Sequence, residues 1–174
     1  MNRAATTRAA IARAAREALA SGGVSALTMS GVAERSGLAR ATVYNHVRDR
    51  SELQSLVVNS LLAEAETVAE AQDTPSGLLC AWADWLAAEP AVAGLRLHDP
   101  AVLVAAIEAG LALGDDVARV GVSALSRVGA HADLSAVDTV ARWLSGFALH
   151  PSEPAAREVS AQILGTALNL DARL

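Results

Sequence analysis

The chain has 174 residues, of which 52% are hydrophobic, and this share supplies enough apolar side chains to argue against a disordered protein. Alanine and leucine dominate while glycine and proline are sparse, which favours helices. The formal net charge of −5 argues against a polyanionic partner, but the charge is uneven: residues 1–50 carry 8 − 3 = +5 and residues 51–174 carry 6 − 16 = −10.

Capping residues, glycines and prolines divide the chain into about nine helices and leave no strand pattern. The expected helices lie at about 6–20, 29–36 and 39–47, in a long segment from about 51 to the break at QDTPSG, in a segment ending at Glu89–Pro90, from Pro100 to Gly114, from Asp115 to Gly129, from Asp133 to Pro151, and around 159–170. The predicted fold is therefore all-α, with an N-terminal three-helix bundle and a C-terminal helical bundle.

Residues 29–47 have the pattern of a helix-turn-helix. Two short helices joined by Gly37 and preceded by a longer helix are typical of the motif that places its second helix in the major groove of DNA. The apolar positions expected to lock the two helices together are Val32, Ala33, Leu38 and Val43. The side chains left to point outward are Arg40, Thr42, Tyr44, Asn45 and His46. All 14 basic residues are arginines, which suit phosphates and guanine edges, although a GC-rich coding bias explains most of that preference.

The stretch LTMSGVAERSGLARATVYNHV and the helix start DRSEL resemble the tetracycline-repressor (TetR) family of bacterial regulators. The resemblance covers roughly residues 6–66. It implies a helix-turn-helix DNA-binding domain over residues 1–50, extending to about 66, and a domain for ligand binding and dimerisation over residues 51–174. The residues that it assigns to DNA are Thr28, Thr42, Tyr44, His46 and Arg50 for phosphates and Arg40 and Asn45 for base edges.

The sequence departs from the family pattern at several positions. Ala39 replaces a common serine, so the second short helix lacks a side-chain cap. Ser30–Gly31 replaces a basic or polar pair, and Val47 replaces an aromatic residue. Plainer roles also stay open for three of the DNA-binding residues: Tyr44 packing on the first helix, His46 in the core or in solvent, and Asn45 on the surface.

The C-terminal helices offer two further sites. Trp82 and Trp85 lie one turn apart, and with Arg96 and His98 they are expected to line a pocket for a largely apolar effector. The alternative is ordinary core packing of the tryptophans with the Arg and His on the surface. The last two helices are apolar on more than one side, which predicts a homodimer interface unless both are central in the monomer. Its residues are Val140, Trp143, Leu144, Phe147, Ile163, Leu164 and Ala167.

The sequence therefore predicts a cytoplasmic, homodimeric repressor that binds a near-palindromic operator and is released by a small ligand. One alternative is an interaction module whose helix-turn-helix no longer binds DNA, and the other is a small helical-bundle enzyme. The sequence lacks a Glu-x-x-His pair, a Ser/His/Asp spacing and a Gly-rich phosphate loop, which argues against the enzyme. The four histidines have no ligand spacing, and no metal or cofactor is expected. The single Cys80 favours a reducing compartment, and the longest apolar run, residues 101–107, is too short for a membrane span.

Overall fold

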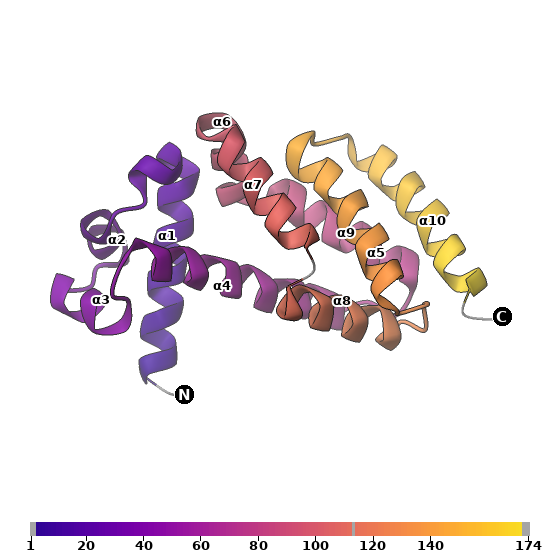
Figure 1. Cartoon of the computed structure of the whole chain (residues 1–174), viewed down its shortest axis with the longest axis horizontal. Coiled ribbons are helices and arrows are strands. Elements are labelled where there is room, and N and C mark those ends of the chain that lie inside the picture. The colour runs from indigo at the N-terminus through magenta and orange to yellow at the C-terminus, as the bar shows by residue number, and fades with distance from the viewer. Residues whose placement is uncertain (1–2, 113, 172–174) are drawn as a thin grey trace. The chain divides into compact units, whose positions relative to one another are not determined.

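The computed structural model describes residues 3–112 and 114–171, and this part of the chain contains ten helices and no strand (Figure 1). The predicted all-α class is confirmed. The helices are α1 (Arg3–Ala26), α2 (Met29–Ser36), α3 (Arg40–His46), α4 (Arg50–Glu70), α5 (Pro75–Ala88), α6 (Pro90–His98), α7 (Pro100–Leu111), α8 (Asp115–Arg127), α9 (Leu134–Leu149) and α10 (Pro154–Asp171). Helix α6 is the helix that the prediction lacked. It begins at Pro90, which was expected only to end the preceding helix, and it is followed by Pro100, which was expected to begin the next one.

The helices form two compact units. The head unit contains Met1–Leu61 and Pro90–Leu103, and the body unit contains Leu62–Glu89 and Val104–Leu174. Helices α4 and α7 contribute residues to both units. Helix α6 belongs to the head unit although it follows α5 of the body unit in the chain.

Helix α1 is the centre of the head unit. Its apolar face is buried at Ile11, Ala15 and Ala18, as the helical spacing predicts. Non-helical angles at Gly22 and Gly23 interrupt it near the predicted end, although the helix is counted to Ala26. The core around α1 contains Val32 of α2, Val43 of α3, Val47 just after α3, and Leu53 and Leu56 of α4.

Glycines allow α6 to pack closely on α1. A Cβ atom on Gly94 would collide with the backbone of Leu19, so the two helices approach at a distance that only glycine permits. Beyond α6, the Asp99 carboxylate accepts a 2.6 Å hydrogen bond from the Val24 N–H. The space for this carboxylate exists because Gly23, with a φ angle of 62°, has no side chain.

The body unit has its own core beneath α5, α8, α9 and α10. Leu78, Leu79, Leu125 and Ala161 are fully buried there. Helix α10 touches the start of α5, where a Cβ atom on Gly165 would lie 2.8 Å from the Ser76 nitrogen. Helices α8 and α9 meet in the same way, with Gly121 against Val137.

No single helix in residues 3–112 and 114–171 is both long and apolar enough to cross a membrane. The bent pair α5 and α6 passes the same test together, by length and composition only.

Candidate nucleic-acid interface

Helix α2 and the turn after it are fixed by local hydrogen bonds. The Thr28 hydroxyl caps α2 by accepting from the Gly31 N–H at 3.0 Å. Gly37 ends α2 in the left-handed conformation, with φ 68° and ψ 13°, and donates its N–H to the Glu34 carbonyl at 3.3 Å. The hydroxyl of Ser36 accepts from the Leu38 N–H at 3.4 Å, which closes the turn. Thr28 is therefore a cap residue with an exposed side chain.

Helix α3 is short and begins without a side-chain cap, as Ala39 predicts. The N–H groups of Thr42 and Val43 instead donate to the Ala39 carbonyl at 2.9 and 3.2 Å. One face of α3 is anchored, because Val43 is fully buried with Val32 and Ala33 of α2. Tertiary packing therefore holds this helix, since seven residues are too few for a stable isolated helix.

The other face of α3 carries the residues predicted to read DNA. Arg40, Tyr44 and Asn45 are exposed, with 53% of the Tyr44 surface accessible, while Thr42 and His46 are half-buried. The large accessible fraction of Tyr44 leaves its ring and hydroxyl open to a partner. The structure thus brings five of the seven predicted DNA-binding residues onto one short helix.

The junction between α3 and α4 contains a hydrogen-bonded cluster of Arg48, Asp49 and Glu52. The Asp49 carboxylate caps α4 by accepting from the Glu52 N–H at 2.9 Å. Glu52 reaches back and accepts from the Arg48 N–H at 2.8 Å and from the Arg48 Nε at 3.3 Å. The backbone bond from Arg48, followed by its guanidinium, lowers the pKa of Glu52. The spacing Asp-x-x-Glu is a capping-box pattern and was the available signal.

Arg50 lies at the start of α4, where the resemblance expects a phosphate contact. Its Nη2 donates to the Val24 carbonyl in the last turn of α1. The same peptide segment is held on its other side, because the Val24 N–H donates to Asp99. Arg35 makes a second side-chain link in the head unit, from Nη2 to the Ser21 hydroxyl at 2.8 Å.

The segment that contains α2 and α3 is similar to a known family of DNA-binding domains. Residues 11–54, which include α2, α3 and the start of α4, match the profile of bacterial regulatory proteins of the tetR family. Residues 11–54 therefore form a DNA-binding domain of the tetR type. This domain makes the chain a DNA-binding transcriptional regulator.

The fold of the whole chain is similar to that of a solved structure. A crystal structure from Mesorhizobium loti, assigned to the TetR-family transcriptional regulators, matches with a TM-score of 0.60 and 20% sequence identity, covering 97% of both chains. At this identity the likeness concerns the fold alone. No curated protein matches the sequence.

The four predicted ligand residues of this regulator are divided between the two units. Trp82 is 5% exposed in the body core and donates its indole N–H to the Ala65 carbonyl at 2.9 Å. Trp85 is half-buried and donates to Glu64 Oε2 at 3.4 Å. Arg96 and His98 belong to α6 in the head unit. The four residues therefore do not form a site within either unit.

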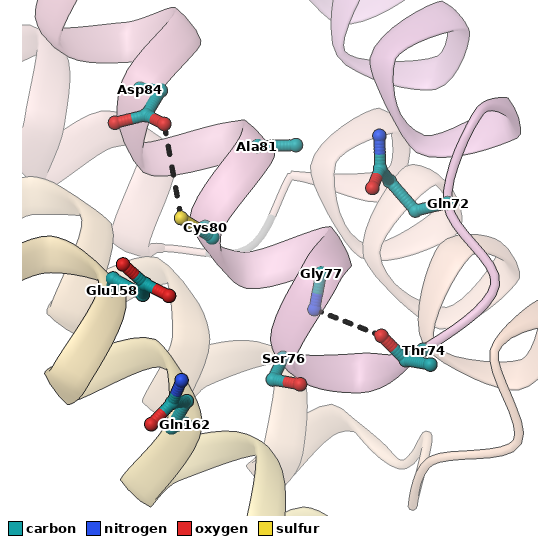
Figure 2. Close-up of a pocket in the computed structure, with 9 residues that line it drawn as sticks. All are labelled: Gln72, Thr74, Ser76, Gly77, Cys80, Ala81, Asp84, Glu158 and Gln162. Carbon is teal, nitrogen blue, oxygen red and sulfur yellow. Dashed lines mark hydrogen bonds between the residues drawn. The ribbon is translucent and has the colours of Figure 1, made fainter. Parts of the chain in front are cut away.

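A cleft of about 450 Å³ lies in the body unit of the regulator, between α5 and α10 (Figure 2). Its lining contains none of the predicted ligand residues and is more polar than expected. It consists of Gln72, Thr74, Ser76, Gly77, Cys80, Ala81, Asp84, Glu158 and Gln162. Asp84 accepts from the Arg157 Nε at 2.6 Å, while its other carboxylate oxygen lies 3.8 Å from the Cys80 sulfur. Burial, followed by the nearby Asp84 carboxylate, raises the pKa of the Cys80 thiol.

The residues predicted for a dimer interface of the regulator differ in exposure. Val140 is buried, and Trp143, Leu144 and Leu164 pack against the body core as half-buried side chains. The rings of Trp143 and Phe147 meet edge to face at 4.8 Å. On α10, Ile163 is 69% exposed and Ala167 is also exposed. The residues of this set that lie open to a partner are therefore on α10.

Proposed function

We propose that this regulator is a homodimeric repressor that recognises a near-palindromic operator with α3 and leaves it when a small ligand binds. The observation that carries the proposal is the two-faced character of α3. Val43 anchors one face in the head core, and Arg40, Tyr44 and Asn45 stand exposed on the other. Such a helix presents hydrogen-bonding groups to a major groove without loss of core packing.

The exposed residues are proposed to divide their work between affinity and sequence recognition. Thr28, Thr42, Tyr44 and His46 contact phosphates, which position the protein but carry no sequence information directly. Arg40 reaches guanine and Asn45 reaches adenine, the bases whose edges their side chains match.

The first experiment selects bound duplexes from a random DNA pool and then measures binding to the selected operator and to random DNA. Arg40→Ala and Asn45→Ala should each weaken operator binding by roughly 1–3 kcal/mol and relax specificity at one base position. Tyr44→Phe serves as the contrast, because loss of a phosphate contact should weaken binding to both DNAs alike. If both alanine variants keep the wild-type ratio of operator to random affinity, α3 is not the recognition helix. If the wild type selects no sequence, a protein-interaction module becomes the better interpretation.

The dimeric part of the proposal is supported by exposed apolar side chains on α10. Val159 and Ile163 lie one turn apart and are 57% and 69% exposed. Two copies of α3 in such a dimer would occupy half-sites about one helical turn of DNA apart, roughly 34–36 Å.

The repressor and ligand parts of the proposal concern the body unit. The α5–α10 cleft is of a size that suits a small molecule, and the amides and carboxylates in its lining favour a ligand with polar groups. A ligand releases DNA only if it binds the conformation with low DNA affinity more tightly, and about 1.4 kcal/mol of such coupling gives a tenfold effect. Transcription from the selected operator in the presence of the regulator tests repression, and its relief by candidate compounds tests release.

A further inference from the structure

The start of α4 carries two arginines, Arg48 and Arg50, whose surroundings differ. The side chain of Arg48 is 89% exposed, and its one hydrogen-bonded nitrogen is Nε, which donates to Glu52. Among the residues that the structure describes, none accepts from its two terminal nitrogens. These nitrogens form the edge of the guanidinium that binds a phosphate through two parallel hydrogen bonds.

Arg50 is also exposed, but one of its terminal nitrogens is hydrogen-bonded to the protein backbone. Its Nη2 donates to the Val24 carbonyl, which also accepts from the Leu27 N–H at 3.1 Å. This carbonyl lies in the short turn that follows the break at Gly22 and Gly23. Val24 is therefore tied to α4 through its carbonyl and to Asp99, at the α6–α7 junction, through its N–H.

We infer that Arg48 is the residue that binds a DNA phosphate at the α3–α4 junction, that Glu52 positions its guanidinium, and that Arg50 instead ties α4 to α1. The inference rests on the proposed DNA binding and reverses the role that the family resemblance gives to Arg50. Arg48 is two residues beyond the end of α3, so its contact would flank the bases that α3 reads.

Glu52 contributes orientation rather than charge to this contact. Its carboxylate fixes both the backbone N–H and the Nε of Arg48, so the guanidinium plane is oriented before DNA arrives. Holding a long side chain in its bound geometry reduces the entropy lost on binding. The carboxylate also repels a phosphate, so its removal has two opposite effects on affinity. The coupling between Arg48 and Glu52 is therefore a better measure than the affinity of Glu52→Gln alone.

The test measures the affinity of the full-length protein for its selected operator at several salt concentrations. Arg48→Gln should reduce the slope of log affinity against log salt by about one for each half-site and weaken binding about tenfold or more. Arg50→Gln should keep the wild-type slope and lower the melting temperature, because it removes an internal tie. Arg119→Gln is the control, since it removes one arginine that is paired with Glu66 in the body unit and should keep the slope.

A double-mutant cycle tests the positioning role of Glu52. In a Glu52→Gln background, Arg48→Gln should cost a smaller factor in affinity than in the wild type, while Arg48→Lys should keep the slope but bind more weakly. Equal costs in both backgrounds would show that Glu52 does not position Arg48.

Three outcomes would overturn the inference. An unchanged slope in Arg48→Gln would remove Arg48 from the phosphate contacts, and this exposed variant is expected to fold. A flattened slope in Arg50→Gln, or in the equally uncharged Arg50→Met if the former does not fold, would return that role to Arg50. A wild type that binds no DNA at low salt would refute the proposed function as well, and it is distinguishable because the failure precedes any mutation.

Discussion

Gly23 and Gly37 both have a positive φ angle, but their surroundings differ. Gly23 combines φ 62° with ψ −153°, a conformation that is open almost only to glycine, and it faces the Asp99 carboxylate. Gly37 has φ 68° and ψ 13°, and a Cβ atom there would meet nothing within 4 Å. Substitution with alanine therefore introduces backbone strain alone at Gly37 and backbone strain together with a collision at Gly23.

We predict that Gly37→Ala destabilises the head unit by about 1–2 kcal/mol through backbone strain alone. Gly23→Ala should cost about 3 kcal/mol or more, because the new Cβ atom also displaces Asp99 from the Val24 N–H. Urea unfolding followed through a head-unit probe would measure both. Equal losses would mean that the contact between Asp99 and Val24 adds little to stability.

Sequence patterns are informative at the residue scale where a contact is local. They predict Thr28 as the α2 cap and Gly37 as its end, because both act within three or four residues. The link from Arg50 to Val24 spans 26 positions, and that from Val24 to Asp99 spans 75. Such contacts depend on how helices pack, so helical periodicity and capping patterns cannot give them.

Elements are predictable where their ends carry distinct signals. Helix α6 escapes prediction because Pro90 resembles the end of α5, whereas it is the first residue of a new nine-residue helix. Gly94 also weakens the helical pattern of this segment. The position of Gly94 is explained only by its contact with the α1 backbone, which no local pattern contains.

Glycines on the last two helices give an element-scale prediction. A Cβ atom on Gly146 in α9 would meet nothing within 4 Å, whereas one on Gly165 in α10 would lie 2.8 Å from the Ser76 backbone. Gly146→Ala should stabilise the body unit by about 0.5–1 kcal/mol, since alanine favours a helix. Gly165→Ala should destabilise it by about 1–3 kcal/mol by forcing α10 from α5. Thermal unfolding of both variants provides the comparison, and a gain in both would place α10 farther from α5.

At the scale of the whole molecule, charge and apolar surface are distributed differently. Residues 1–50 carry a net charge of +5 against −10 for residues 51–174, which suits a head that meets DNA and a body that does not. Exposed apolar side chains on α10 support the proposed homodimer. The sequence predicts the apolar character of the last two helices, but which residues stay exposed depends on how each chain packs its own core.

We predict that Ile163→Glu converts the dimer into a monomer without unfolding the chain. Ile163 is 69% exposed within one chain, so the charge is solvated in the monomer but would be buried without a partner in the dimer. Light scattering would measure the mass, and circular dichroism would verify the fold. Leu134→Glu is the matched control, because Leu134 is 58% exposed at the first residue of α9 and is not among the residues predicted for the interface. A dimeric Ile163→Glu variant would move the interface away from this part of α10.

The missing cap at Ala39 has a consequence for how tightly DNA is held. Helix α3 is seven residues long and depends on Val43 for its attachment, so its amides should exchange with solvent through local opening before those of α1. Only the ordered form presents all its side chains to a groove. Operator affinity is then multiplied by the fraction of time that α3 is formed. A residue that shifts this opening equilibrium changes the affinity for every DNA sequence by the same factor and leaves base preference unaltered.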